Sequence, residues 1–466
     1  MDTCNIITNG YVLGIKIGEG TCGKVWSAEK DGKQFAIKQC KMGKNGIPNI
    51  VEIDIAKRFK HPNIINFIDI FVIDEIDNKS IYYVMPIADK TLNMYIISMQ
   101  QKKHLIFQIL SAVSFLHENM ICHGDLKPEN ILMFGDIPVI TDFGLSCHLD
   151  SNCICSPTPV YAPPETLYKS PDYEEYFDEA CVSDLIKLQS SIDDKRIIDI
   201  WSIGIVIVYI LINEHIFMYG EKNIVSQMLQ YIKDQDKYLD FFKIDETFIS
   251  CVKRLLEPSP DLRVSNLKDI LSLPIFTGLI SPNGTTIQKD FYHNSMSERT
   301  LKIAVDWIYE VCCVQKIAVK CYLLSVDLFY RCFNLIYDGN HRHIQVIIAA
   351  CMLIADKLDR GCDLSVEYLT WLSNHSFQEN DLIDIEIKII LKLFGILNIN
   401  PLYSYCSNDR SLVMASPLIR QRDIYINSNI EQYVSQIESS MIIDKNIKHN
   451  NPLMDIFNKY TSPTKD

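Results

Sequence analysis

The chain has 466 residues, of which 48% are hydrophobic and 22% are charged, a balance typical of folded proteins with more than one domain. Its 45 basic and 58 acidic residues give a net charge of −13, which disfavours nonspecific binding to nucleic acid or to an anionic membrane. The first residues contain no basic segment followed by an apolar run. We therefore expect no signal peptide and an intracellular location, cytoplasmic or nuclear.

The first part of the chain combines strand patterns with helix patterns. Residues 11–38 alternate apolar and polar side chains with glycines between them, which predicts strands joined by turns. Residues 47–60 predict a helix, and the apolar segments 65–73 and 81–87 predict buried strands. Helical patterns then dominate. The apolar run 200–213 is too short to span a bilayer comfortably and indicates a buried helix.

The rest of the chain divides by composition. An acidic, Tyr-containing segment at about 168–196 predicts an exposed insertion. Residues 281–296 are polar, contain glycine and proline, and predict a linker. Residues 297–400 carry apolar side chains at helical spacing, which predicts an all-α domain. Residues 401–466 are richer in Asn, Ser and Asp, and we expect low to moderate order there.

A glycine-rich hairpin is the first chemical motif. The sequence IGEGTCGKV places Gly18, Gly20 and Gly23 where a backbone can lie close over a polyphosphate. Alone this spacing is a weak signal. Lys38 ends the next strand and can hold the α- and β-phosphates, and Glu52 in the following helix can orient that lysine through an ion pair. The three features together indicate a nucleotide site.

The octapeptide HGDLKPEN supplies groups for phosphoryl transfer. Asp125 can accept the proton of an attacking hydroxyl, and Lys127 can neutralise charge on the transferred group. Asn130 and Asp142, the latter in DFG, offer the oxygen ligands that Mg2+ prefers. The sequences APPE, DIWSIG and finally Arg263 follow in that order. The combination matches the protein-kinase signature set.

These motifs resemble the eukaryotic protein kinases, and the wording of IGEGTCGKVWSAE and GIPNIVEIDIAKRFKHPNI resembles the cyclin-dependent kinases most. The resemblance implies an α+β, bilobal kinase domain over 1–280, with a small lobe at about 1–88 and a large lobe at about 89–280. It implies Mg2+ and ATP in the cleft, and protein substrates with Ser or Thr acceptors. It also implies a buried ion pair between Glu165 and Arg263.

The resemblance further assigns contacts with ATP. Met85 would lie beside the adenine, the Pro86 carbonyl and the Ala88 amide would bind it, and Leu132 would lie beneath it. The other residues implied to contact ATP lie on the first three strands: Ile17, Gly18, Gly20, Gly23, Val25, Ala36 and Lys38.

The phosphate switch of the cyclin-dependent kinases has no counterpart here. In that family three arginines converge on a phosphothreonine in the activation loop. The arginine positions are Gly124, Val51 and Cys147, and the threonine position is Cys153. A phosphate gains little where no cations face it, so we expect activity without activation-loop phosphorylation. The alternative is that this shortened loop is misaligned and that Ser151 or Ser156 is phosphorylated instead.

Residues 297–400 resemble a single cyclin box. RTLKIAVDWIYEV is similar to its first helix, AACMLIADKLDRG to its third and LIDIEIKIILKLFGILN to its fifth. In cyclins, a lysine and a glutamate at the positions of Lys357 and Glu386 grip the kinase near its regulatory helix. The resemblance implies that the kinase is bound by its own cyclin-like domain, in cis or in trans, which would complete the Lys38–Glu52 pair.

The sequence leaves two rival functions open. The chain could be a pseudokinase scaffold whose helical domain binds partner proteins, or an active kinase whose C-terminal domain only docks substrates. A compact fusion rich in Ile and Asn also fits a large DNA virus as the source.

Overall fold

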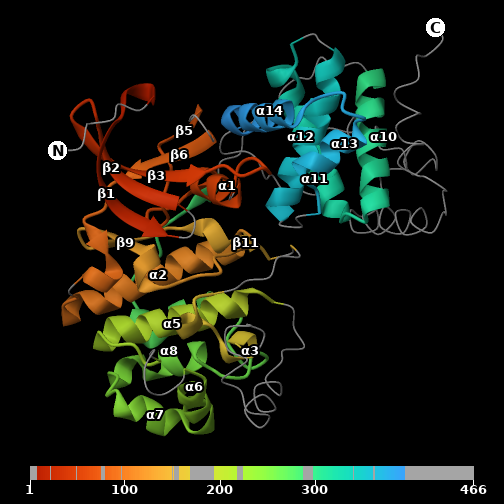
Figure 1. The fold of residues 1–466 in the computed structure, drawn as a ribbon. Helices are drawn as coiled ribbons and strands as arrows, with labels where there is room; N and C mark the ends of the chain where they lie inside the picture. The colour runs from red at the N-terminus through yellow and green to blue at the C-terminus, as the bar shows by residue number, and fades with distance from the viewer. Residues whose placement is uncertain are drawn as a thin grey trace. The chain divides into compact units, whose positions relative to one another are not determined.

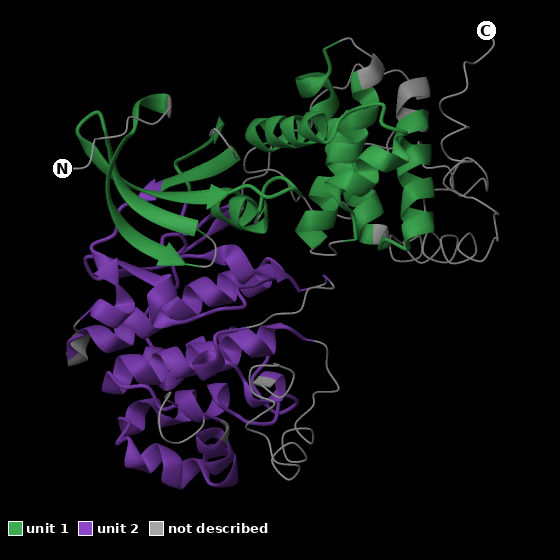
Figure 2. Cartoon of the chain, in the orientation of Figure 1, with its two compact units in different colours: residues 1–58, 67–84, 287–466 green, residues 59–66, 85–286 purple. Residues whose placement is uncertain are grey.

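The computed structural model describes residues 8–20, 23–48, 50–74, 79–95, 97–149, 151, 157–167, 194–217, 224–286, 298–338, 341–359 and 363–393. The chain forms two compact units (Figure 2). Unit 1 comprises residues 1–58, 67–84 and 287–466, and unit 2 comprises residues 59–66 and 85–286. Unit 1 contains the main sheet and a helical domain, whereas unit 2 is dominated by helices (Figure 1). The predicted α+β class followed by an all-α domain is confirmed.

A five-stranded sheet in the order β1-β2-β3-β6-β5 forms the first part of unit 1 (Figure 1). The strands are β1 (Val12–Gly20), β2 (Gly23–Lys30), β3 (Lys33–Lys41), β5 (Asp69–Asp74) and β6 (Lys79–Pro86). Tyr11, Ile37, Phe71 and Val84 form part of one buried cluster on the sheet. The sequence predicts a strand over the whole of 65–73, but β5 begins only at Asp69, where its register with β6 starts.

Helix α1, Ile50–Arg58, is shorter at both ends than the helix predicted over 47–60. Pro48 explains the late start, since the residue before a proline is disfavoured in helical conformation. At the other end, Phe59–Lys60 forms β4 and pairs with β12, Thr285–Thr286. Sequence patterns cannot show this pairing, because its partner belongs to the predicted linker.

Five helices form the second part of unit 1: α10 (Glu298–Gln315), α11 (Val319–Ile336), α12 (His341–Asp359), α13 (Val366–Leu372) and α14 (Glu379–Lys392). Helix α12 contacts α10, α11 and α14, and its centre is fully buried from Ile347 to Ala355 except for 3% exposure at Ile348. The quoted motifs identified α10, α12 and α14, and the helical spacing of apolar residues across 297–400 predicted further helices. Helix α13 was missed because it is short, although Ser365 caps its first turn by accepting a hydrogen bond from the Tyr368 amide.

Unit 2 is built around helices. They are α2 (Met99–Glu118), α3 (Pro164–Leu167), α5 (Arg196–Ile212), α6 (Ile224–Lys233), α7 (Gln235–Phe241), α8 (Glu246–Leu255) and α9 (Leu267–Leu271). Its short strands are β4, β12, β7 (Lys90–Thr91), β8 (Ile121–Cys122), β9 (Ile131–Phe134), β10 (Ile137–Ile140) and β11 (Cys147–His148). Helix α5 is the buried helix predicted over 200–213. Within the described ranges, no helix is long and apolar enough to cross a membrane.

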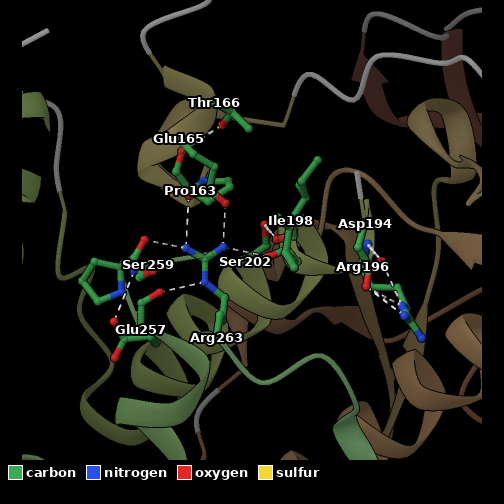
Figure 3. A network of polar contacts seen from close by, with 12 residues as sticks. Pro163, Glu165, Thr166, Asp194, Arg196, Ile198, Ser202, Glu257, Ser259 and Arg263 are labelled. Carbon is green, nitrogen blue, oxygen red and sulfur yellow. Dashed lines mark hydrogen bonds and ion pairs between the residues drawn. The ribbon is translucent and has the colours of Figure 1, made fainter. Parts of the chain in front are cut away.

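The predicted ion pair between Glu165 and Arg263 is confirmed. The two guanidinium nitrogens donate to the two carboxylate oxygens at 2.7 and 3.1 Å, and both side chains are buried (Figure 3). The guanidinium also lies 5.0 Å from the ring centre of Trp201 on α5. Through Arg263 this network links APPE to helix α5. The bidentate ion pair restricts both the distance and the relative orientation of the Glu165 and Arg263 side chains.

Candidate active site

Lys38 and Glu52 lie together in unit 1. The Lys38 ammonium on β3 is 2.6 Å from the Glu52 carboxylate on α1. Their exposed fractions are only 8% and 2%. Breaking such a pair leaves a buried charge without compensation, so the position of α1 and the position of the Lys38 ammonium depend on each other.

The glycine-rich hairpin is the turn between β1 and β2. Gly18 is opposite Val25, and Gly20 is opposite Gly23, which closes the described part of the hairpin. Ile17 is 48% exposed, and Ala36 is buried on β3. The hairpin tip, Thr21 and Cys22, lies outside the described residues.

The shortest contacts of the Asp125 carboxylate are with Lys127 and Thr158, within unit 2. Its Oδ2 lies 2.7 Å from the Lys127 ammonium. Its Oδ1 accepts hydrogen bonds from the Thr158 amide at 2.9 Å and from the Thr158 hydroxyl at 2.7 Å. Burial raises the pKa of Asp125, but Lys127 and Thr158 outweigh burial, so its net pKa lies below the ordinary value. Asp125 is therefore ionised at neutral pH and able to accept a proton.

Thr158 is a site residue that sequence reasoning missed. Its hydroxyl also accepts a hydrogen bond from the Lys127 ammonium at 2.8 Å, so Thr158 links the proton acceptor to the phosphate-directed lysine. Thr158 lies in the sequence SPTP, a few residues before APPE. Its short distance from APPE along the chain is a signal for Thr158, but the contact with Asp125 becomes visible only in three dimensions.

Thr158 gives a pH prediction. A Thr158→Val substitution removes the hydroxyl donor, so the pKa of Asp125 should rise toward its ordinary value. The acidic limb of kcat/KM against pH should move to higher pH, because activity requires ionised Asp125 and protonation would begin sooner on acidification. Thr158→Ser keeps the donor and should leave the limb in place. Kinase assays across pH measure both, and an unmoved limb in Thr158→Val contradicts this role.

Asp199 on α5 binds the backbone of the catalytic loop, which is the octapeptide HGDLKPEN at residues 123–130. This fully buried carboxylate accepts hydrogen bonds from the amides of His123 at 2.7 Å and Gly124 at 2.9 Å, and it contacts His117 Nε2 at 2.9 Å. Gly124 has φ of +80°, a conformation that glycine adopts without strain. The sequence DIWSIG identified the motif but did not indicate this role for its aspartate.

The metal-directed oxygens come from Asn130 and Asp142. The Asn130 amide nitrogen donates to the Asp125 carbonyl at 2.9 Å, so its amide oxygen is left for another partner. Asp142 is half-buried and left-handed, with φ of 60°. An amide oxygen and a carboxylate fit Mg2+, which usually keeps several ligands from water and substrate phosphates. Among the described residues, no group of three or more His, Cys, Asp or Glu side chains forms a metal centre.

The residues assigned to the adenine belong mostly to unit 2. Met85 is buried, Pro86 is exposed and Ala88 is half-buried. Leu132, also half-buried, lies on β9 opposite Thr91 and Val139. The structure thus divides the predicted site residues between the two units: the glycine hairpin, Ala36 and the Lys38–Glu52 pair lie in unit 1, and the remaining ATP and catalytic residues lie in unit 2.

The positions of the missing arginines are apolar or glycine. Val51 is 2% exposed, and Cys147 is fully buried against Cys122 on the neighbouring strand. Cys153 and Ser156 lie outside the described residues. Ser151 is buried, and its hydroxyl donates to the His148 carbonyl at 2.6 Å. In this conformation a kinase has no access to the Ser151 hydroxyl.

Lys357 and Glu386 meet each other and the segment before α1. The two side chains form an ion pair. Glu386 Oε2 accepts a hydrogen bond from the Ile47 amide at 3.2 Å, and the Lys357 ammonium donates to the Ile47 carbonyl at 3.3 Å. Burial raises the pKa of Glu386 despite the opposing effect of Lys357. Gly46, with φ of +78°, lies against this pair.

A second contact joins the helical domain to the sheet within unit 1. The Lys79 ammonium on β6 pairs with Asp384 on α14 and lies 3.5 Å from Asp74 on β5. Partial burial lowers the pKa of Lys79, but the two carboxylates outweigh burial and raise it above the ordinary value. The helix α12 also contacts α1. The helical domain therefore contacts both the helix that carries Glu52 and the edge of the sheet.

Two family models match successive parts of the chain. The family model described as a protein kinase domain matches residues 11–276, and the cyclin N-terminal domain model matches residues 279–397.

Three curated relatives illustrate the range of similarity. The chain is 30% identical over 281 residues to CBL-interacting serine/threonine-protein kinase 18 of Arabidopsis thaliana, covering 56% of this chain and 48% of that protein. It is 32% identical over 217 residues to a probable cell division protein kinase of Encephalitozoon cuniculi, covering 44% and 73%. It is 33% identical over 183 residues to the CTD kinase subunit alpha of Saccharomyces cerevisiae, covering 36% and 34%. The match thus spans less than half of the Arabidopsis and yeast proteins.

Proposed function

Because the chain belongs to the protein kinase family and carries a cyclin N-terminal domain, we propose that it is an ATP-dependent protein serine/threonine kinase activated by that domain. The observation that carries this proposal is the Lys357–Glu386 pair on the backbone of Ile47. Ile47 lies just before α1, and α1 carries Glu52. The cyclin-like domain thus reaches the element on which the position of Lys38 depends.

The proposed reaction uses the chemistry of each set of residues. Lys38 binds the α- and β-phosphates of ATP, and the glycine hairpin covers them. Asp125 orients the acceptor hydroxyl and takes its proton, while Lys127 neutralises charge on the transferred phosphoryl group. Asn130 and Asp142 would hold Mg2+, which when bound offsets the charge of the phosphates.

Activation follows from the linked contacts in unit 1. The cyclin-like domain favours the arrangement of α1 in which Glu52 reaches Lys38, and this shifts the population toward the competent state. Covalent attachment gives the domain a high effective concentration, so a modest interface can stay occupied. Protein substrates and the domain itself are the proposed partners. Docking in cis and docking on a neighbouring chain are both compatible with attachment.

Activation without a phosphate on the activation segment is part of the proposal. The positions of Gly124, Val51 and Cys147 offer no cation to a phosphate. Ser151, the described alternative acceptor, is buried with its hydroxyl already donating to His148. Mass spectrometry of the active enzyme should find no stoichiometric, activity-requiring phosphate between residues 145 and 161.

Two rival functions, a pseudokinase scaffold and a kinase with a substrate-docking domain, are distinguished by the experiments below. The presence of Lys38, Glu52, Asp125, Asn130 and Asp142 argues against a pseudokinase scaffold. The contacts with Ile47 and with the sheet argue against a domain that only docks substrates. A viral source has no support from the relatives named above, which come from a plant, a microsporidian and a yeast.

A Glu386→Ala substitution in the full chain tests the proposal. It removes the acceptor for the Ile47 amide and leaves Lys357 half-buried without its carboxylate, so docking weakens. Because the tether buffers the loss, we expect kcat/KM on a peptide substrate to fall by about tenfold, corresponding to about 1.4 kcal/mol.

Glu379→Ala is the matched control. Glu379 is an exposed glutamate on the same helix, and its removal should leave activity unchanged. Steady-state kinetics and thermal unfolding of the three proteins measure activity and folding separately. Wild-type activity in a folded Glu386→Ala variant would contradict activation through this contact and favour the substrate-docking rival.

A further inference from the structure

Lys195 lies where a lysine is electrostatically out of place. It immediately precedes Arg196, the first residue of α5, with helical φ and ψ of −62° and −17°, and its side chain makes no capping hydrogen bond. The positive end of the helix dipole repels a cation at this position. A residue that breaks a local rule in this way often serves a function elsewhere.

The Lys195 ammonium instead contacts the first part of the activation segment, which is the stretch of chain between DFG and APPE. It donates to the Leu149 carbonyl at 3.2 Å and to the Ser151 carbonyl. The backbone of Lys195 is also held in place. Its own carbonyl accepts a hydrogen bond from the Cys122 thiol at 3.4 Å. The Lys195 side chain is half-buried, so water competes only in part with the two carbonyl oxygens for its ammonium.

The neighbouring charges are already committed to each other. Asp194 caps α5 by accepting from the Arg196 amide at 3.1 Å, and its carboxylate also binds the Arg196 guanidinium at 2.8 to 3.0 Å (Figure 3). The carboxylate beside Lys195 thus neutralises Arg196. This leaves the Lys195 ammonium directed to the two carbonyl oxygens.

The held residues belong to a segment with a catalytic task. The Leu149 amide donates to the Met120 carbonyl and the Ser151 amide to the His148 carbonyl, at 2.9 and 3.1 Å. Further along the same segment, Thr158 binds Asp125 through its amide and its hydroxyl. The positions of Leu149 and Ser151 therefore bear on whether Thr158 can reach Asp125.

We propose that Lys195 is a positioning residue for catalysis: its ammonium holds Leu149 and Ser151 by their carbonyl oxygens and thereby orders the described part of the activation segment without phosphate. This inference rests on the proposed function, since it explains how an enzyme without the phosphate switch keeps this segment in place. The ammonium binds backbone acceptors, which every sequence offers, and so its action requires no modifying enzyme.

The test uses full-length Lys195→Met, which keeps the length and apolar volume of the side chain but removes its charge. We expect kcat for a peptide substrate to fall by ten- to a hundredfold, with KM for ATP changed less than about twofold, because Lys195 acts on the segment and not on nucleotide. Lys195→Arg retains the cation and should restore most of kcat. Hydrogen exchange of the Leu149 and Ser151 amides should become at least tenfold faster in Lys195→Met.

Lys102→Met is the matched control. Lys102 is a half-buried lysine that also donates to a backbone carbonyl, that of Leu211 near the other end of α5, at 2.6 Å. Its loss should cost similar thermal stability while leaving kcat and exchange at Leu149 and Ser151 unchanged. If Lys195→Met retains wild-type kcat and exchange, or if Lys102→Met reproduces its defects, the inference is overturned.

Failure of the proposed function gives different results. A wild type that transfers no phosphate, or one that requires phosphate between residues 145 and 161, contradicts the proposed function alone. The exchange measurement still decides the role of Lys195 in either case, because it reports the position of the segment without requiring activity.

Discussion

An Asp125→Asn variant is expected to lose phosphoryl transfer by about 10²- to 10⁴-fold in kcat, the usual contribution of a positioned general base. Asparagine keeps the shape of the side chain and can still accept hydrogen bonds from Thr158. It cannot take the proton of the acceptor hydroxyl, and it no longer pairs its charge with Lys127. The variant should fold and bind Mg-ATP, which thermal shift measures beside single-turnover transfer.

The chain offers a control with the same pair of threonine hydrogen bonds on an exposed aspartate. Asp245 caps α8, and its carboxylate accepts from the Thr247 amide at 2.9 Å and from the Thr247 hydroxyl at 2.7 Å. Asp245→Asn therefore repeats the substitution against equivalent partners, away from the catalytic loop, and should retain activity because asparagine also caps helices well. Undiminished transfer by Asp125→Asn would contradict its role as base. A wild type that binds nucleotide without transfer would instead favour the scaffold.

A Gly46→Ala variant should show the second large effect, a loss of activity of about a hundredfold. A Cβ atom at position 46 would lie 2.0 Å from Glu386 Oε2 and 3.2 Å from the Lys357 ammonium. Its φ of +78° adds strain for any other residue. Left-handed strain of about 1–2 kcal/mol and overpacking of about 1–3 kcal/mol together exceed the loss that the tether should buffer.

The matched control for Gly46→Ala separates strain from collision. Gly32 has a similar φ of +72° in the turn between β2 and β3, but no atom lies within 4 Å of a Cβ placed there. Gly32→Ala should therefore reduce stability without reducing activity. Adding Glu386→Ala to Gly46→Ala should recover part of the activity, because it removes the colliding carboxylate. Steady-state kinetics of this double-mutant cycle measure the coupling, and strictly additive losses would contradict direct contact.

Much of the candidate site could be predicted from the motifs in the sequence. Phosphoryl transfer requires a phosphate-binding lysine, an acidic partner for it and a proton acceptor. Lys38, Glu52 and Asp125 could be identified because the kinase motifs place these groups at characteristic positions along the chain. The structure places Lys38 against Glu52 and surrounds Asp125 with donors, as that chemistry requires. Lys357 and Glu386 were inferred from a resemblance, and the structure brings them together on the backbone of Ile47.

Other features depend on tertiary pairing and had no local signature. Thr158 and Lys195 are ordinary polar residues in the sequence. The contact of Thr158 with Asp125, and those of Lys195 with Leu149 and Ser151, depend on how the loops fold back. The ends of α1 are set by Pro48 and by pairing with a strand more than two hundred residues away. Periodicity describes which face of an element is apolar, but it does not identify the distant partner that ends it.

Unit 1 is assembled from the two ends of the chain, and this has a consequence for biosynthesis. The bonds from the helical domain to Ile47 and Lys79 join residues separated by 339, 310 and 305 positions. During translation the sheet leaves the ribosome long before α12 and α14 exist. Domains fold as their sequence emerges, so nascent or prematurely terminated chains should carry a folded but inactive catalytic part. Under the proposed activation, synthesis of the chain through α14 thus becomes a condition for activity.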